Sequence, residues 1–148
     1  MSTYTQLIYQ IVFSTKDRNN TLLESNREKL FRYIWGILKS KNCTIYQING
    51  MEDHLHIATH IHPTIALSTL VKDIKVSSSN WIKQENIFPN FESWQLGYGA
   101  FTYSIKEKEA LIHYLKNQKE HHQLKCFKEE YIDLLREHGI DFNEKYLL

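Results

Sequence analysis

The amino-acid sequence predicts an α+β domain of ferredoxin-like, split β-α-β topology. We expect an antiparallel four-stranded sheet with two helices on one face and a C-terminal helical extension. Hydrophobic periodicity switches between strand and helix spacing in the order β-α-β-β-α-β, and two more helical segments follow. The second and third strands are joined by the short segment Gly50-Met51-Glu52-Asp53, which favours an antiparallel hairpin.

The first part of the chain is predicted to form a strand, a helix and the hairpin. Residues Thr5–Phe13 are rich in aromatic and β-branched side chains, as in a strand, and the polar segment 14–20 follows as a loop. From about Ser25 to Lys41, apolar residues recur at steps of three and four, which indicates an amphipathic helix. Segments 43–49 and 55–61 supply the hairpin strands.

The second part supplies a long helix, the last strand and the helical extension. Residues 64–84 keep helical spacing and form the longest predicted helix. Residues 91–103 are aromatic and carry two glycines, which predicts a strand that bends or lets another backbone approach closely. A capping-box pattern at 104–107 begins a helix that extends to about His122, and a last helix covers about 128–138.

Composition indicates one globular domain. With 148 residues, 42% hydrophobic and 24% charged, the chain is not disordered, and we expect a single domain 1–148 with a core of 1–104 and C-terminal helices 105–148. No apolar run approaches a membrane span, and the N-terminus lacks signal-peptide features, so we expect a cytoplasmic protein without membrane contact. A net charge of +1 limits nucleic-acid contact to local sites.

The third predicted strand carries a candidate metal site. His54 and His56 are two residues apart, so both imidazoles project from one face of the strand and can share a divalent ion. For an isolated His-x-His pattern, a polar sheet face is the commoner explanation. His60 and His62 lie too far along the strand to be ligands of the same ion.

A second candidate site lies on the third predicted helix. Tyr114 and Gln118 are four residues apart and share one helix face. Alone, this pair usually means a packed ring beside a hydrogen-bonding neighbour. Combined with two imidazoles, an amide oxygen can complete a metal shell and a phenolate can attack phosphorus. Because the pKa of tyrosine is near 10, it needs a nearby base or cation, which Mg²⁺ or Mn²⁺ can supply.

Five stretches of the sequence resemble one known family. They are VFSTKDR at 12–18, NGMEDHLHI at 49–57, VKDIKVSSSNWI at 71–82, WQLGYGAFTYS at 94–104 and YLKNQKEHH at 114–122. In this order they are similar to the single-tyrosine HUH transposases, insertion-sequence enzymes that move single-stranded DNA. Their relatives associated with repetitive extragenic palindromes (REPs) share the pattern.

The resemblance implies roles for four residues. His54 and His56 correspond to the HUH histidines, Gln118 to the residue that completes the metal site, and Tyr114 to the nucleophile. It implies a 5′-phosphotyrosine intermediate, Mg²⁺ or Mn²⁺ as cofactor, and single-stranded DNA with imperfect hairpins as substrate. It also implies a homodimer whose subunits share active sites, and a bacterial protein that is nucleoid-associated when bound to DNA.

Further residues could contact nucleic acid. Basic side chains near the matching stretches are candidates for phosphate contacts: Lys16, Arg18, Lys72, Lys75 and Lys83. Aromatic side chains could stack on unpaired bases, although packing in the core competes with this role: Trp81, Trp94, Tyr98 and Phe101.

Two alternatives stay open. The first is a non-catalytic nucleic-acid-binding protein, such as a domesticated relative, because residues 97–103 partly match the signature of RNA-binding sheets. The second is a metal-dependent hydrolase that activates water. It needs a carboxylate near the histidines, and Asp53 is the only close one in sequence, on the opposite strand face if the strand extends that far.

Overall fold

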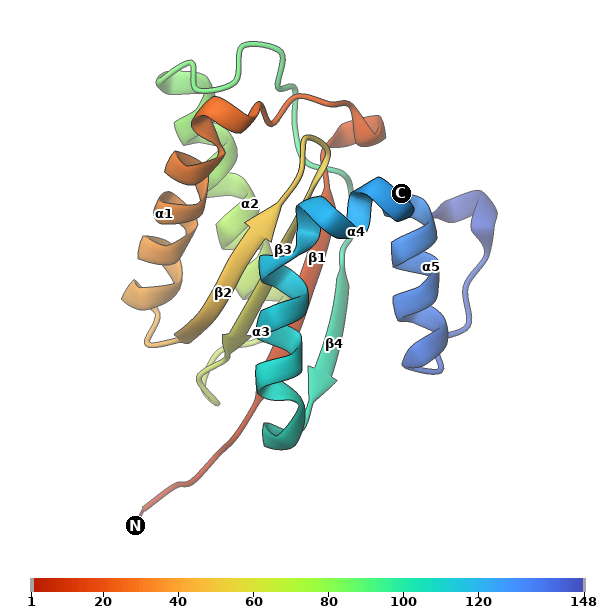
Figure 1. Cartoon of the computed structure of the whole chain (residues 1–148). Helices are drawn as coiled ribbons and strands as arrows, with labels where there is room; N and C mark the ends of the chain where they lie inside the picture. Colours follow the sequence, from red (N-terminus) through yellow and green to blue (C-terminus); the bar gives the residue numbers. More distant parts are fainter. Residues whose placement is uncertain (1, 148) are drawn as a thin grey trace.

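The computed structural model describes residues 2–147 and confirms the predicted fold class (Figure 1). The sheet has the order β2-β3-β1-β4, and every neighbouring pair is antiparallel. Because β3 lies between β1 and β2, the connection through the first helix is a split β-α-β unit. The strands are β1 (Ile8–Ser14), β2 (Thr44–Gly50), β3 (His54–His60) and β4 (Gly99–Tyr103).

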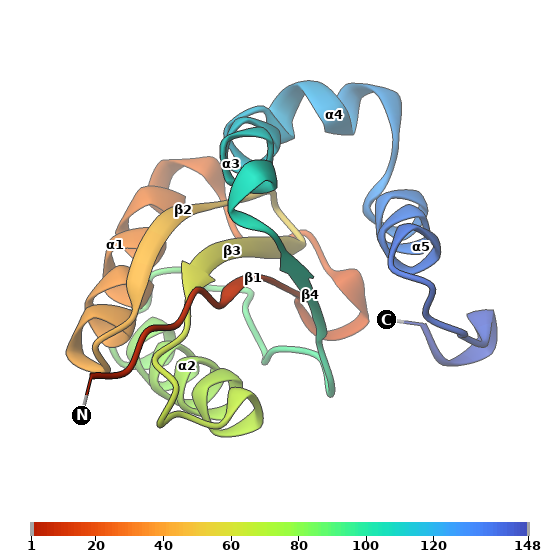
Figure 2. The ribbon, with the colours of Figure 1, turned by 90° about the horizontal axis from the view of Figure 1, so that it is seen from below.

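Helices cover both faces of the sheet (Figure 2). The helices α1 (Glu24–Ser40) and α2 (Leu67–Gln84) pack on one face, as predicted. On the other face lie α3 (Lys108–Lys116) and α5 (Phe127–Glu137), joined by the short α4 (Gln118–Leu124). No helix within residues 2–147 has the length and apolar character that crossing a membrane requires.

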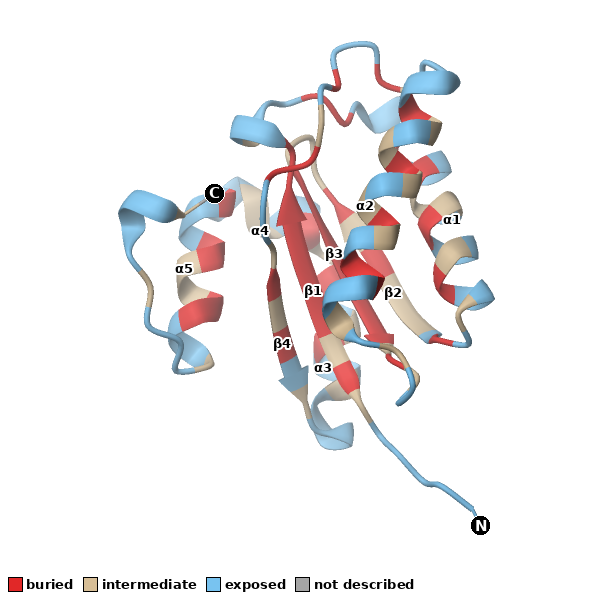
Figure 3. Ribbon diagram, turned by 180° about the vertical axis from the view of Figure 1, so that it is seen from behind, coloured by how far each residue is buried: buried red, intermediate tan, exposed pale blue. Residues whose placement is uncertain are grey.

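Alternation along β1 divides the core into two layers. Ile11 and Phe13 pack with the residues of α1 and α2, whereas Ile8 and Val12 pack toward α3 and α5. In the ladder, His56 is paired with Val12. Figure 3 shows that β1 and β3 are buried except at Tyr9 and His60, which are half-buried. The histidine face of β3 is therefore the face that α3 and α5 cover.

The predicted helix from 105 to 122 is divided in the structure. It begins with a 3₁₀ turn at Ile105–Glu107, and Asn117 leaves helical geometry with φ −99° and ψ 25°. The side-chain Nδ2 of Asn117 lies 2.9 Å from His113 Nε2. Asparagine side chains compete with regular helix hydrogen bonding, which makes Asn117 a natural break. The break spans one residue, so periodicity alone does not reveal it.

The fourth strand is shorter than predicted. Only Gly99–Tyr103 pairs with β1 as a strand. The preceding segment is irregular, and its backbone pairing is one isolated bridge between Thr15 and Trp94. Gly97 has φ +91°, a left-handed conformation that interrupts an extended strand. Lys75 Nζ donates to the carbonyl oxygens of Gln95 and Gly97, which replaces strand pairing there. The other elements begin and end within three residues of the predicted bounds.

Gly50 fixes the turn that leads into the histidine strand. A Cβ atom at this position would lie 2.3 Å from the His54 carbonyl oxygen, which is backbone and cannot move aside cheaply. Gly36, in contrast, is an exposed helix residue whose added Cβ would meet nothing within 4 Å. The two glycines therefore form a matched pair for testing the packing of the hairpin.

We predict opposite effects for alanine at these two glycines. Gly50→Ala should lower the free energy of unfolding by about 1–3 kcal/mol through overpacking. Gly36→Ala should raise it by about 0.5–1 kcal/mol because glycine is unfavourable in a helix interior. Urea denaturation of both variants measures the difference. Equal midpoints for Gly50→Ala and the unsubstituted protein would contradict the close approach.

Candidate catalytic and metal site

His54 and His56 lie side by side at the start of β3, both fully buried, with ring centroids 5.0 Å apart. His54 Nδ1 is 2.7 Å from Asp53 Oδ1, and His56 Nδ1 is 2.7 Å from Gln10 Oε1. Both of these oxygens are acceptors, so each Nδ1 carries the proton. The Nε2 atoms are then free to act as ligands, and their partners fix the ring orientations.

Gln118 and Tyr114 reach the same place from α4 and α3. Gln118 is fully buried, and its Oε1 lies 3.2 Å from His54 Nε2. Its Nε2 donates to Glu130 Oε2 over 3.2 Å, and the Tyr114 hydroxyl donates to the same oxygen. The single helix predicted to carry both residues is divided at Asn117, but Tyr114 and Gln118 still meet at one oxygen of Glu130.

Glu130 is the residue that sequence reasoning missed. It is buried on α5, and its Oε1 lies 2.9 Å from His56 Nε2 and 3.6 Å from His54 Nε2. The sequence did contain a signal, because Glu130 interrupts the apolar face that Phe127 and Leu134 mark on this helix. An acidic side chain on an apolar helix face is costly to bury, so such a position indicates function or pairing.

Asp53 lies outside the strand. The sequence places it on the opposite strand face only if the strand extends that far, but β3 begins at His54, and Asp53 in the preceding turn accepts a hydrogen bond from the His54 ring. Asp53 therefore orients a candidate ligand, and the carboxylate nearest both histidine Nε2 atoms is Glu130.

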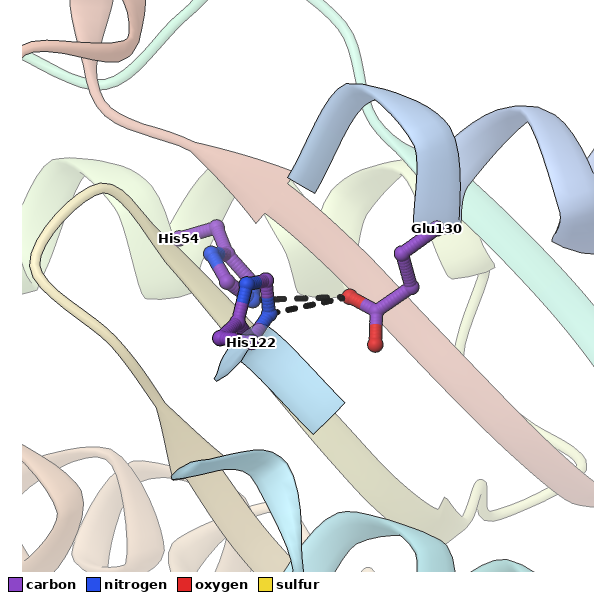
Figure 4. A group of neighbouring side chains, drawn as sticks. All are labelled: His54, His122 and Glu130. Carbon is purple, nitrogen blue, oxygen red and sulfur yellow. Dashed lines mark ion pairs between the residues drawn. The ribbon is translucent and has the colours of Figure 1, made fainter. Parts of the chain in front are cut away.

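His122 adds a third imidazole to the site (Figure 4). Its Nε2 is 3.4 Å from Glu130 Oε1, and its ring centroid is 4.5 Å from that of His54. This nitrogen is buried and has no hydrogen-bond partner within the described residues. The candidate ligand atoms of His54, His122 and Glu130 all lie within 4.8 Å of one another.

Burial and charge set the protonation states. Burial raises the pKa of Glu130, but the imidazoles of His122, His56 and His54 outweigh it and hold this pKa well below its usual range. Burial lowers the pKa of His56, and burial together with the Glu130 carboxylate raises the pKa of Tyr114. The site therefore contains a carboxylate, a neutral His56 and a protonated phenol.

This donor set fits a divalent cation. With Nδ1 protonated, the His56 Nε2 lone pair faces Glu130 Oε1, and the His54 Nε2 lone pair faces Gln118 Oε1 at 3.2 Å. Lone pairs that converge on one another without donors repel unless a cation lies between them. Imidazole, carboxylate and amide oxygen are all ligands of first-row divalent metals.

A cavity of about 410 Å³ opens beside this cluster, between α3, α5 and β4. Tyr114 and Glu130 line it together with the apolar residues Leu111 and Leu134. Through Tyr114 and Glu130, the cavity borders the otherwise buried cluster.

The predicted DNA-contact residues are not gathered at this site. Lys72 and Lys83 are exposed on α2, which lies on the sheet face opposite the histidines. Lys16 forms an ion pair with Glu92 at 3.3 Å. Arg18 is half-buried in the turn after β1. Burial lowers the pKa of Lys75 to about 8, and this side chain holds two carbonyl groups. Their contact with DNA stays a prediction.

The candidate stacking residues are mostly committed to packing. Trp94 and Phe101 are buried, and the Trp81 ring stacks on Tyr33 with centroids 4.5 Å apart. Tyr98 is half-buried under Lys75. Within the described residues, none of these four rings is fully exposed for stacking on a base.

Solved structures share this fold. A crystal structure from Deinococcus radiodurans R1, assigned as a transposase, is 19% identical with a TM-score of 0.62; the match covers 80% of this chain and 95% of that one. A REP-associated tyrosine transposase bound to a REP hairpin is 15% identical with a TM-score of 0.60; the match covers 100% of this chain and 92% of that one. These identities are low enough that the similarity establishes the fold alone.

Sequence comparison identifies the family. No curated protein matches the chain at a significant level. The family profile described as "Transposase IS200 like" does match, over residues 3–118, which is most of the chain and includes both histidines, Tyr114 and Gln118. The predicted resemblance is therefore confirmed, and this protein belongs to the IS200-like transposase family.

Proposed function

We propose that the protein cleaves and rejoins single-stranded DNA through a covalent bond between Tyr114 and a 5′ phosphate. One observation carries the proposal: the Tyr114 hydroxyl, two histidine Nε2 atoms and the Gln118 amide converge on one buried carboxylate. Membership of a transposase family supports DNA as the substrate class.

The proposed cation ligands are His54, His56 and Gln118. Asp53 and Gln10 hold the two imidazoles with Nε2 directed into the site. Bound Mg²⁺ or Mn²⁺ supplies Lewis acidity toward a phosphate oxygen. Imidazole ligands suit Mn²⁺ at least as well as Mg²⁺.

Tyr114 is the proposed nucleophile. Its oxygen forms a bond to phosphorus, the bond from phosphorus to the 3′ oxygen breaks, and the phenolic proton ends on the released 3′-OH. The phosphodiester is conserved as a phosphotyrosine ester, so rejoining needs no external energy source. Glu130 accepts the hydrogen bond of the phenol and fixes the position of its oxygen.

DNA hairpins are the proposed recognition element, because one structural neighbour is a REP-associated transposase bound to a REP hairpin. Basic residues, with Lys16 and Arg18 near the end of β1, are the proposed phosphate contacts. The homodimer with shared active sites remains a proposal. Tyr114 already lies next to the histidines of its own chain, with ring centroids of Tyr114 and His56 at 6.0 Å, so sharing requires exchange of this region between subunits.

A water-activating hydrolase is the second candidate, and the observation that favours it is Glu130. A buried carboxylate beside two imidazoles is also the arrangement that positions a hydrolytic water. The tyrosine variant below distinguishes the two reactions.

Tyr114→Phe should abolish covalent attachment to DNA while leaving Mn²⁺ binding unchanged, because only the phenolic oxygen is lost. The protein is incubated with hairpin-containing single strands from the DNA flanking its own gene and with Mn²⁺ or Mg²⁺, and adducts are resolved on a denaturing gel. Tyr33→Phe, behind the sheet, is the matched control and should retain the adduct. Cleavage retained by Tyr114→Phe supports hydrolysis; hairpin binding without cleavage by either protein supports a non-catalytic relative.

His54→Ala should weaken Mn²⁺ binding at least about tenfold, since it removes a ligand from the shell. His60→Ala is the control on the same strand, because His60 only accepts a hydrogen bond from the Leu7 amide. Isothermal titration calorimetry measures both affinities. Equal weakening by the two substitutions would argue against His54 as a specific ligand.

A further inference from the structure

We propose that Glu130 is itself a ligand of the cation, so that cation binding fastens α5 to the sheet. This inference rests on the proposed function, because it shares the cation of His54 and His56. It adds a residue beyond the segment 3–118 that the family profile matches. The C-terminal helix then belongs to the metal site.

Distances place Glu130 among the ligands. Its Oε1 lies 2.9 Å from His56 Nε2, 3.6 Å from His54 Nε2 and 3.4 Å from His122 Nε2. Ligands of one ion at about 2.1 Å lie roughly 3 Å apart when they occupy neighbouring octahedral positions. The Glu130 oxygen therefore has the spacing of a neighbour in one coordination shell.

Charge gives a second reason. His54, His56 and Gln118 as neutral ligands leave a buried divalent ion without a counter-charge, which is costly in a low-dielectric environment. Glu130 is the only buried carboxylate within residues 2–147. It therefore supplies the negative charge that the other three side chains lack.

Hydrogen bonding gives a third reason to count Glu130 among the ligands. Glu130 Oε2 accepts hydrogen bonds from Tyr114 and Gln118, whereas Glu130 Oε1 faces imidazole nitrogens. Because His56 donates to Gln10 through Nδ1, the Nε2 atom of His56 that faces Glu130 Oε1 is unprotonated. His122 Nε2 is buried beside Oε1 without a hydrogen-bond partner. A cation at this point gives both Oε1 and the unpaired nitrogen a partner.

The alternative is that α5 only covers the site. In that case the Glu130 carboxylate occupies the position of the cation, and a cation that binds displaces it. The two possibilities predict opposite responses of α5. Packing holds this helix through Tyr131, whose ring approaches Gly99 so closely that a Cβ there would lie 2.7 Å from it. A cation that binds Glu130 adds a cross-link to this packing, whereas one that displaces Glu130 removes its anchor.

Hydrogen–deuterium exchange of the full chain with and without Mn²⁺ distinguishes the two. Amides of residues 127–137 should exchange at least about tenfold more slowly with Mn²⁺ if Glu130 is a ligand. Unchanged or faster exchange there, with Mn²⁺ bound, would overturn the proposal. The measurement uses the unsubstituted protein, so it does not depend on a variant that folds.

Glu130→Gln supplies the second arm. This nearly isosteric change should weaken Mn²⁺ binding at least about tenfold, while Glu129→Gln, an exposed neighbour on the same helix, should not change it. Equal Mn²⁺ affinity in Glu130→Gln and the unsubstituted protein would overturn the inference. If His54→Ala weakens Mn²⁺ binding at least about tenfold and abolishes the DNA adduct in that case, the proposed function survives. Absence of both Mn²⁺ binding and adduct in the unsubstituted protein would refute the function and the inference together.

Discussion

The antiparallel register of β1 and β3 is the constraint on which the site depends. Ile11 on β1 is paired with Ile57 on β3, and both side chains point into the core beneath α1 and α2. Because side chains alternate along a strand, His54 and His56 must then point to the other face. A shift of one residue would place the imidazoles in that apolar core and remove the site.

The second face combines apolar packing with a buried polar cluster. Two small clusters, around Leu115 beneath α3 and around Phe101 beneath α5, flank the histidines and exclude water. Inside this environment, Asp53 and Gln10 accept hydrogen bonds from the Nδ1–H groups of His54 and His56, which would otherwise be costly to bury. These hydrogen bonds therefore orient the imidazoles without a bound ligand, which favours chemistry that needs fixed positions.

The C-terminal helix links the two parts of the site. Through Glu130 it contacts the phenol from α3, the amide from α4 and the imidazoles from β3. A chain that ended with the segment matched by the family profile would lack this carboxylate. The extension thus contributes a side chain to the candidate site as well as to the packing of this face.

The sequence by itself determined the order of elements and the histidine pair on one strand face, because these follow from the local periods of strands and helices. The tertiary structure alone decided that Glu130 joins them and that Asp53 turns to His54. It also revealed the break at Asn117 and the short β4. The contacts of Glu130 and the length of β4 depend on segments distant in sequence, and periodicity within a segment carries no information about which side chains meet across the fold. The break at Asn117 and the turn at Asp53 are departures of a single residue, which periodicity does not reveal.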